Sequence, residues 1–512
     1  MRAKVAVSAL SILLAAPLGA QTGSLSATQT AQIYSANPFS SDRFGRDVLL
    51  DGGVALVMYG TFTSSYLVRC IADVGGTWTY PASPGFATQG YTMSFEGNLY
   101  LQGFPYGSPI DRVAVWRRSG STWSQSWLNI PDIGPADETF GVSTDIDGAT
   151  VVIGNHYHTQ TLAEEGAVYV YEDTGSSLVL RQRIFGGVAG ARIGVTVRVS
   201  GEDLLVYYNA APNAFGVRAY RRQNGVWVLA QSDAAPVGQL SGGIELDRGL
   251  AVARTSGGGF HVLANAGSGW FVDATIPPVQ GSAGAYDLEL DDGVIAASDP
   301  DADLAASDAG AVRLYARNDG WKLQATVVAS DAQPLDYFGY GIGLQGNRLM
   351  VGAPNDDDRG NDAGAVYEFR LEHAPARVHC APERSSLGCV AHIGFAGVPS
   401  ASSGAPFTLS ASNVVSHRGG MLVYGTSGPA FVRYPGGVRC VAAPRRTTAR
   451  QSSGGSSGAS DCSGALTIDF NAFVASGVDP LLFVGQSVDA QWVYRDPLGP
   501  SALASSEAVH FT

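Results

Sequence analysis

Two short loops alternate aspartate or asparagine with other residues, a pattern that offers several oxygen ligands from one place. They read SDPDADLAASDAGAV and APNDDDRGNDAGAV, and each runs directly into an apolar segment. Carboxylate and carbonyl oxygens grouped in this way suit a hard cation. The competing interpretation is a solvated acidic turn, where Asp and Asn are favoured for their backbone conformations. The candidate ligands are Asp299, Asp301, Asp303 and Asp308 in the first loop, and Asn355, Asp356, Asp358 and Asp362 in the second.

A comparison of the two loops predicts which ligands correspond. Counting back from the following strand pairs Asp301 with Asp356, Asp303 with Asp358 and, across a two-residue insertion, Asp308 with Asp362. A third loop, GNHYHTQTLAEEGAV, has His156 and His158 in place of acids. A transition metal needs further ligands that are not obvious here, so we interpret this segment as an exposed loop.

Two motifs resemble catalytic or nucleotide-binding signatures, but the flanking secondary structure that these signatures need is missing. GIGLQG, from Gly341 to Gly346, is followed by a strand pattern, whereas a dinucleotide site needs a helix there. GGSSG, from Gly454 to Gly458, lies in a low-complexity run, whereas a nucleophile elbow needs a strand before it and a helix after it. No Ser/His/Asp, Cys/His or paired-carboxylate set stands out elsewhere, so the sequence names no catalytic residue.

The acidic loops are positioned by a longer repeat, in which an FG-like pair precedes a strand, a tight turn and a second apolar strand. Seven copies start 44 to 54 residues apart. They are FGRDVLLDGGVALVMYG from Phe44, QGYTMSFEGNLYLQG from Gln89, FGVSTDIDGATVVIG from Phe140, IGVTVRVSGEDLLVYY from Ile193, LSGGIELDRGLAVAR from Leu240, GAYDLELDDGVIAAS from Gly284 and FGYGIGLQGNRLMVGAP from Phe338. A repeat of this length predicts a solenoid, a propeller or an array.

A second phrase of the type GAVYVY, a turn and a Trp-bearing strand follows the first phrase, so each repeat encodes four strands, the content of a propeller blade. The seventh copy stops after GAVYEFRLE and lacks its outer strand. The segment from Leu25, LSATQTAQIY, matches the outer strand that begins at Leu323. We therefore predict an all-β, seven-bladed propeller closed by the N-terminal strand, which removes a free sheet edge. A tandem array of β-sandwiches is the alternative.

The first twenty residues predict export. Arg2 and Lys4 precede an apolar run from Val5 to Leu18, which is short for a membrane span, and Gly19-Ala20 offers a cleavage site. A membrane anchor is the alternative. The 512-residue chain carries a net charge of −13, which disfavours nucleic-acid partners.

The FG phrase ends near residue 373, and short strands continue to the C-terminus. We predict a signal peptide over 1–20, a propeller over 21–373 and a disulfide-stapled, sandwich-like β domain over 374–512. Four cysteines of this last domain allow three pairings, and we favour Cys380–Cys389 with Cys440–Cys462 because each closes a short loop. Cys70 lies in the apolar segment LVRCIA and is expected to be a buried free thiol.

The pattern FG…VGAP…GAVYVY resembles the FG-GAP repeat, found in the propeller of integrin α-subunits and in secreted bacterial proteins. The resemblance covers about Leu25 to Glu372. It implies that the loop before the GAV strand holds calcium in the sixth and seventh copies, through the eight candidate ligands named above. The C-terminal stretch resembles a module that occurs on secreted bacterial repeat proteins.

Family resemblance implies an exported, non-catalytic, adhesion-type binding protein, secreted or at the cell surface or in the periplasm, and we expect a monomer. Its propeller faces would bind a protein or glycan partner, with Ca²⁺ as a stabiliser. The enzyme alternative is an extracellular hydrolase or lyase whose site forms where residues of different blades converge at the axial mouth. A structural role in the cell envelope is the third possibility. Fold alone does not decide among them.

Overall fold

Short strands with alternating apolar residues, separated by glycine and aspartate turns, build the whole molecule in this computed structural model. The structure describes residues 24–512 except 37, 39, 61–65, 82–85, 89–91, 106–111, 130–138, 211–213, 236–239, 268, 280–284, 435–436 and 459. The predicted signal peptide lies outside these residues. The described part contains one helix, α1 (Phe470–Ala475), and no helix that is long and apolar enough to cross a membrane.

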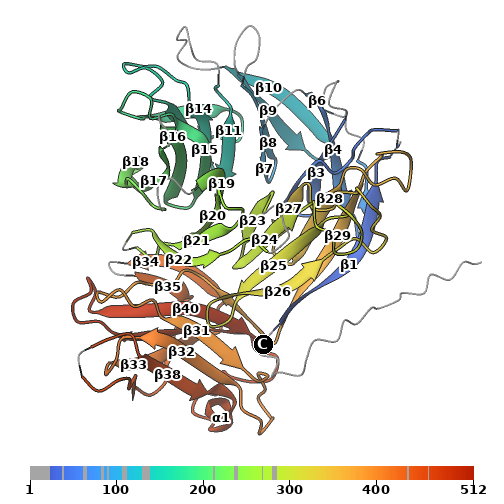
Figure 1. Cartoon of the computed structure of the whole chain (residues 1–512). Coiled ribbons are helices and arrows are strands. Elements are labelled where there is room, and N and C mark those ends of the chain that lie inside the picture. The colour runs from blue at the N-terminus through green and yellow to red at the C-terminus, as the bar shows by residue number, and fades with distance from the viewer. Residues whose placement is uncertain are drawn as a thin grey trace, which may run out of the picture.

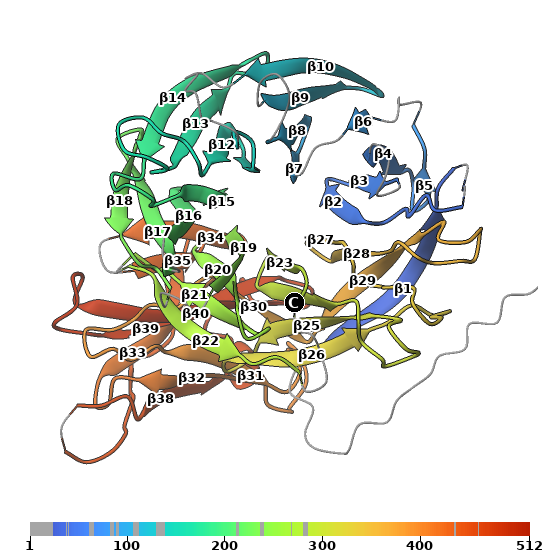
Figure 2. The ribbon, with the colours of Figure 1, turned by 45° about the horizontal axis from the view of Figure 1, so that its top comes forward.

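Seven antiparallel sheets stand around one axis, and each comes from one copy of the repeat (Figure 1, Figure 2). From the axis outward, blades 1 to 3 contain β2 (Asp47–Asp51), β3 (Val54–Tyr59), β4 (Tyr66–Asp73) and β5 (Trp78–Thr79), with β6 (Phe86–Thr88) beside β4; β7 (Thr92–Glu96), β8 (Leu99–Phe104), β9 (Arg112–Ser119) and β10 (Thr122–Asn129); and β11 (Ser143–Asp147), β12 (Thr150–Asn155), β13 (Ala167–Asp173) and β14 (Leu178–Phe185). Blades 4 to 6 contain β15 (Ile193–Ser200), β16 (Asp203–Ala210), β17 (Ala214–Gln223) and β18 (Val226–Gln231); β19 (Leu240–Asp247), β20 (Leu250–Thr255), β21 (Phe260–Ala264) and β22 (Phe271–Ile276); and β23 (Leu288–Asp291), β24 (Val294–Asp299), β25 (Ala311–Arg317) and β26 (Trp321–Val327).

Blade 7 is completed by the N-terminal strand, as predicted. It contains β27 (Ile342–Gln345), β28 (Arg348–Ala353), β29 (Ala365–Ala374) and β1 (Ser24–Tyr34). β1 pairs antiparallel with β29 from Ser24 opposite Ala374 to Tyr34 opposite Ala365. The innermost strands contact one another in the closed order β2, β7, β11, β15, β19, β23, β27 and back to β2. Both the seven-bladed ring and its closure are therefore confirmed.

A circle of hydrogen bonds joins the blades at the turn after each innermost strand. In every blade, the side chain of the last strand residue accepts a hydrogen bond from the backbone N–H at the same turn of the next blade, with N···O distances of 2.5 to 3.0 Å. The acceptors are Asp51, Glu96, Asp147, Ser200, Asp247, Asp291 and Gln345, and the donors are Gly97, Gly148, Gly201, Arg248, Asp292, Gly346 and Gly52. We call this end of the axis the turn end, and the opposite end, where the FG pairs lie, the mouth.

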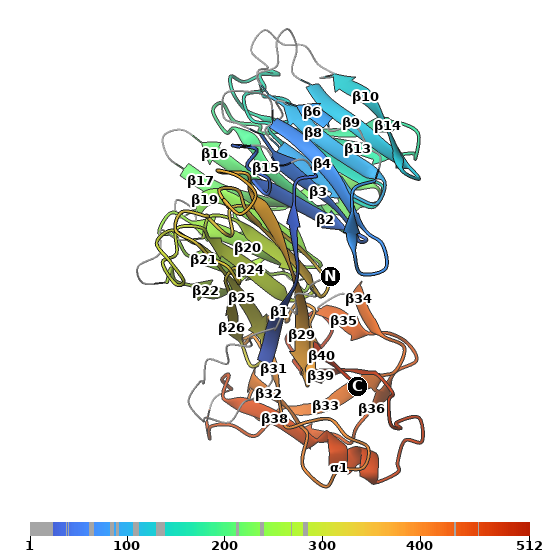
Figure 3. The same ribbon diagram turned by 90° about the vertical axis from the view of Figure 1, so that its right-hand side faces the viewer.

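The C-terminal domain is a two-sheet sandwich, as predicted, and it lies beside the propeller (Figure 3). Six strands form the sheet β30-β40-β39-β33-β36, with β37 beside β33, and three form the sheet β31-β32-β38. Phe407, Leu422 and Trp492 meet in the core between them. The strands are β30 (Ala376–His379), β31 (His392–Ala396), β32 (Thr408–Val414), β33 (Gly419–Gly425), the hairpin β34 (Pro429–Tyr434) and β35 (Gly437–Val441), β36 (Arg446–Thr447), β37 (Gln451–Ser452), β38 (Gly464–Asp469), β39 (Val488–Arg495) and β40 (Leu503–Phe511).

The predicted disulfide pairing is wrong, although all four cysteines are bonded. The bonds join Cys380 to Cys440 and Cys389 to Cys462, with sequence separations of 60 and 73 residues. Cys380 follows β30, which pairs with β40, and β35 carries Cys440 against β39 and β40. Sheet topology thus outweighs nearness in sequence, because the entropy of closing a loop grows only slowly with its length. Cys70 is a buried free thiol, as predicted.

A buried charge cluster fixes the C-terminal domain against blades 5 and 6. Arg317 of β25 is 1% exposed at its side chain and forms an ion pair with Asp273 of β22 and, at 3.2 Å, with Glu507 of β40. The Nδ1 atom of His392 lies 2.8 Å from Glu507. Burial lowers the pKa of His392, but Glu507 and Asp273 more than offset this, so its pKa is raised. Side chains of opposite charge from blades 5 and 6 and from the C-terminal domain thus meet in one buried cluster.

Candidate metal and ligand sites at the propeller mouth

An acidic cluster in blade 7 contains two of the predicted metal ligands. Asp356 and Asp358, in the loop between β28 and β29, meet Asp331, which follows β26 of the preceding blade. One carboxylate oxygen from each lies within 4.8 Å of the others. The hydroxyl oxygen of Tyr367 of β29 lies 2.6 Å from Asp356 and 2.9 Å from Asp331, so its one proton is placed between the two carboxylates. Asp362 is not part of this acidic group, and Asn355 lines the pocket at the mouth.

The electrostatics of the cluster fit a hard cation. Burial, and then the carboxylates of Asp358 and Asp331, raise the pKa of Asp356, which is 3% exposed. Burial and the same acidic surroundings raise the pKa of Asp336 to about 6. Three oxygens at this spacing in a partly buried site are ligands that Ca²⁺ accepts, and bound Ca²⁺ would remove the repulsion that raises these pKa values.

The sixth-copy loop does not form a matching cluster. Asp299 is buried and makes an ion pair with Arg313 at 2.7 Å, so its charge is already balanced. Asp303 accepts a hydrogen bond from the backbone N–H of Asp308 at 2.8 Å, as in an ordinary turn. Asp301 is exposed and lines a pocket at the mouth. The four predicted ligands of this loop therefore do not converge on one point.

The predicted correspondence between the two loops is off by one position. Asp299 lies opposite Ala311, and Ala353 lies opposite Ala365, so the loops are equal in length and have no insertion. Asp308 and Asp362 do correspond, with φ angles of 51° and 49°. Asp301 corresponds to Asn355 and Asp303 to Asp357, whereas Asp356 and Asp358 correspond to Ala302 and Leu304. The sixth loop thus lacks the two acids that form the cluster.

The third-copy loop has the same backbone, with histidine in the place of Asp356. The N–H of Gly166 donates to the carbonyl of His158, as the N–H of Gly364 does to Asp356. Residues 159–163 of this loop are exposed, as expected, but His158 itself is 1% exposed and its ring stacks on Phe185 at 5.5 Å. Among the described residues, neither His156 nor His158 belongs to a group of three metal-binding side chains. The described contact of His158 is therefore a packing contact with Phe185.

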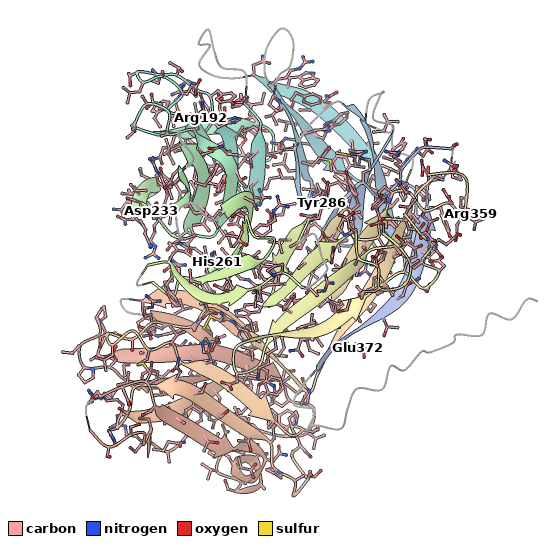
Figure 4. The ribbon with its side chains drawn as sticks, in the orientation of Figure 1. Arg192, Asp233, His261, Tyr286, Arg359 and Glu372 are labelled. Carbon is pink, nitrogen blue, oxygen red and sulfur yellow. A yellow bond between two sulfur atoms is a disulfide. The ribbon has the colours of Figure 1, made fainter. Side chains whose placement is uncertain are left out.

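A pocket of about 280 Å³ lies at the mouth where blades 6, 7 and 1 meet. Tyr286, Tyr340 and Arg46 occupy one repeat position in these blades, five residues before the turn-end acceptors Asp291, Gln345 and Asp51. Figure 4 shows Tyr286 on the inner side of the ring. The remaining lining residues are Arg43, Pro300, Asp301, Tyr337, Pro354 and Asn355.

Carboxyl groups gather around the axis, on or beside the innermost strands between the mouth and the turn end. Burial raises the pKa of Asp47 to about 6 and the pKa of Asp145 to about 7. The pKa of Asp287 is raised to about 7, mainly by burial and then by Asp47 and Glu245. Arg198 of β15 also lies here and pairs with Glu245 of β19 at 2.6 Å. These carboxyls come from several blades.

Comparison with known proteins identifies one repeat. Residues 321–369, from the outer strand of blade 6 through most of β29, match the family model of the FG-GAP repeat. No curated protein sequence matches the chain. A solved structure, the crystal structure of the WD40 β-propeller domain of Doa1, aligns with a TM-score of 0.40 and 15% identity over 67% of this chain and 98% of that chain. The protein is a β-propeller that carries an FG-GAP repeat.

Sequence reasoning missed Asp331 and the tyrosines of the mouth. Asp331 lies in a linker, 25 residues before Asp356, and no motif joins them. A signal was available for the pocket: blades 3, 4 and 5 have Val142, Val195 and Gly242 at the position of Tyr286, Tyr340 and Arg46. When consecutive repeats have aromatic or charged residues at a position where the other repeats have smaller ones, that position indicates a binding surface.

Proposed function

Starting from a propeller that carries an FG-GAP repeat, we propose that this chain is an exported, non-catalytic binding protein of the bacterial secreted type, whose partner docks at the mouth. The observation that carries this proposal is the mouth pocket. Its tyrosine and arginine side chains replace the small residues that blades 3 to 5 have at the same position. Concave sites lined by aromatic groups and a few polar groups are typical of ligand binding.

Ca²⁺ bound by Asp331, Asp356 and Asp358 is the proposed stabiliser of this end of the molecule. The cluster links the loop of blade 7 to the linker from blade 6, because Asp331 and Asp356 share the hydroxyl of Tyr367. Tyr34 of β1 donates to Asp358 at 2.9 Å, so the closing strand also contacts the cluster. A cation here would hold together the three segments that complete the ring.

Export is supported by the leader sequence and by the two disulfides, which persist in oxidising compartments. The division into residues 1–20, 21–373 and 374–512 stays a prediction. It is compatible with the end of β29 at Ala374 and the start of β30 at Ala376.

Binding at the mouth can be tested with two defined probes, a printed glycan array and a phage library of random peptides. We expect binding to one of them that the double variant Tyr286→Ala/Tyr340→Ala loses. Trp127→Ala is the matched control, because Trp127 is an exposed aromatic residue on the outer strand β10. Binding that the mouth variant keeps, or no binding to either probe, would contradict the proposal.

One observation favours the enzyme alternative. Burial raises the pKa values of Asp145 and Asp287, near the propeller axis, to about 7, and a carboxyl that titrates near neutral pH can serve as a general acid. A hydrolase would release reducing ends from a polysaccharide panel, and Asp287→Asn would abolish that release. If no polysaccharide is cleaved, or if cleavage survives in Asp287→Asn, these carboxyls have a structural role only.

A further inference from the structure

The chemistry of the mouth pocket identifies its ligand class. We infer that the pocket binds a neutral, ring-sized saccharide unit, an inference that rests on the proposed binding function. Three properties lead to it: the exposed tyrosine surface, the balance of charges around the pocket, and its size.

Tyrosine rings form the first wall. Tyr286 is 48% exposed, and its ring centroid lies 4.9 Å from that of Tyr340 at an interplanar angle of 45°. The guanidinium group of Arg46 lies over the ring of Tyr340, 5.4 Å from its centroid. The arginine and the neighbouring tyrosine hold Tyr340 in place, whereas nearly half of Tyr286 faces solvent. Such a surface offers apolar contact beside polar hydroxyls.

Hydrogen-bond donors and acceptors form the second wall of the pocket. Arg43 and Arg46 can donate hydrogen bonds, Asp301 can accept them, and Asn355 can do both. A sugar hydroxyl also donates and accepts, so a polyhydroxylated ring can pair with donors and acceptors that lie close together.

Charge balance excludes strongly ionic ligands. The lining carries both signs of charge, with Arg43 and Arg46 on one side and Asp301 on the other, and Arg43 also has a carboxylate of Asp362 at 3.6 Å. An anion would therefore meet Asp301, and a cation would meet two guanidinium groups. A neutral ligand meets no such penalty.

The size of the pocket favours one ring over an extended chain segment. Its volume of about 280 Å³ is at the lower limit of ordinary ligand pockets, which begin at roughly 300 Å³. Pro300 and Pro354 are buried at its rim and limit its extension outward along the two loops. An acidic or proline-rich peptide would need a longer groove.

The test is a calorimetric titration of the mature protein with the methyl glycosides of glucose, galactose, mannose and N-acetylglucosamine. We expect at least one to bind, and Tyr286→Ala to weaken it about tenfold, the loss expected from one aromatic contact. Tyr286→Phe should keep most of the affinity. Because Tyr286 is half exposed, both variants should fold, and their melting temperatures check this. Glucuronate and choline serve as the anionic and cationic probes.

The outcomes separate this inference from the proposed function. If none of the neutral glycosides binds but a selected peptide does, and Tyr286→Ala abolishes that binding, the saccharide inference is wrong and the binding function stands. Stronger binding of glucuronate or choline than of every neutral glycoside would also overturn it. If glycosides and peptides all fail to bind, both proposals fall. Glycoside binding that Tyr286→Ala leaves unchanged would place the saccharide elsewhere and overturn the inference.

Discussion

The side-chain oxygen of Gln345 accepts a hydrogen bond from the backbone N–H of Gly52 at 2.7 Å, although the two residues are 293 positions apart. This contact is the seventh of the circle at the turn end, and it joins the last blade to the first. The other six contacts use carboxylates or a serine hydroxyl in the same place. Closure of the ring is thus specified at both edges of blade 7, by β1 on the outside and by Gln345 at the axis.

Gln345→Ala should lower the free energy of unfolding by about 1 kcal/mol, because the Gly52 N–H loses its partner. Urea unfolding followed by tryptophan fluorescence measures this. Ser200→Ala is the matched control, since Ser200 makes the equivalent bond within the ring. Similar losses would show that the closing seam is an ordinary one. No loss in Gln345→Ala would mean that β1 alone carries the closure.

Ca²⁺ should raise the melting temperature of the mature protein relative to chelator. A ligand that binds only the folded state at a hundred times its Kd adds about 2.7 kcal/mol. Asp356→Asn/Asp358→Asn should abolish the rise, because both residues belong to the cluster. Asp303→Asn, in the equivalent loop of blade 6, should leave it unchanged. A rise that survives in the double variant would place the cation elsewhere, and no rise at all would refute the calcium proposal.

The pH dependence of stability should carry a contribution from Asp145. Its pKa rises from 3.8 to about 7 on folding, so the folded state binds the proton more tightly. The resulting stabilisation is complete below about pH 4 and is lost as the pH rises through 7. Asp145→Asn keeps an acceptor for the Val199 N–H, which donates to Asp145 at 2.7 Å. Relative to wild type, this variant should therefore gain stability between pH 4 and 7.

The size of that relative gain should be roughly 1–3 kcal/mol, since one pKa unit corresponds to about 1.4 kcal/mol and the partial solvent exposure of Asp145 reduces the full effect. Urea unfolding at a series of pH values measures the difference between variant and wild type. Asp303→Asn is the control, because Asp303 is exposed and should show no such trend. A difference that does not change with pH would show that Asp145 is ionised in the folded protein at neutral pH.

The repeat made the propeller predictable, whereas contacts between repeats were largely out of reach. The truncated copy at Glu372 and the unpaired strand at Leu25 are complementary, so closure could be predicted from the two ends alone. The charge pair between Arg198 and Glu245 could not, because it joins two blades through side chains that face the axis. The spacing of residues in the sequence predicts contacts within a blade. It does not predict which side chains of different blades meet at the propeller axis.

The same limit explains the errors at the acidic loops and the disulfides. The aspartates of the two loops predict one alignment, but the backbone aligns the loops on the strand ends Asp299 and Ala353. Nearness in sequence predicts short-range pairing of the cysteines, but β35, which carries Cys440, packs against β40. In both cases the controlling contact is a strand pairing or packing contact that lies outside the local motif.

Removing Arg317 should destabilise the docking of the two domains strongly, because Asp273 and Glu507 would remain buried with only His392 as a basic partner. Breaking a buried ion pair from one side typically costs roughly 3–5 kcal/mol. Arg317→Met should therefore lower the unfolding free energy by about that amount and expose the linker near Ala374 to limited proteolysis. Arg317→Met/Glu507→Gln removes one of the stranded charges as well and should recover part of the loss. If the double variant is less stable than the single one, Glu507 is held by His392 rather than by Arg317, and the domain contact depends on the Glu507–His392 pair.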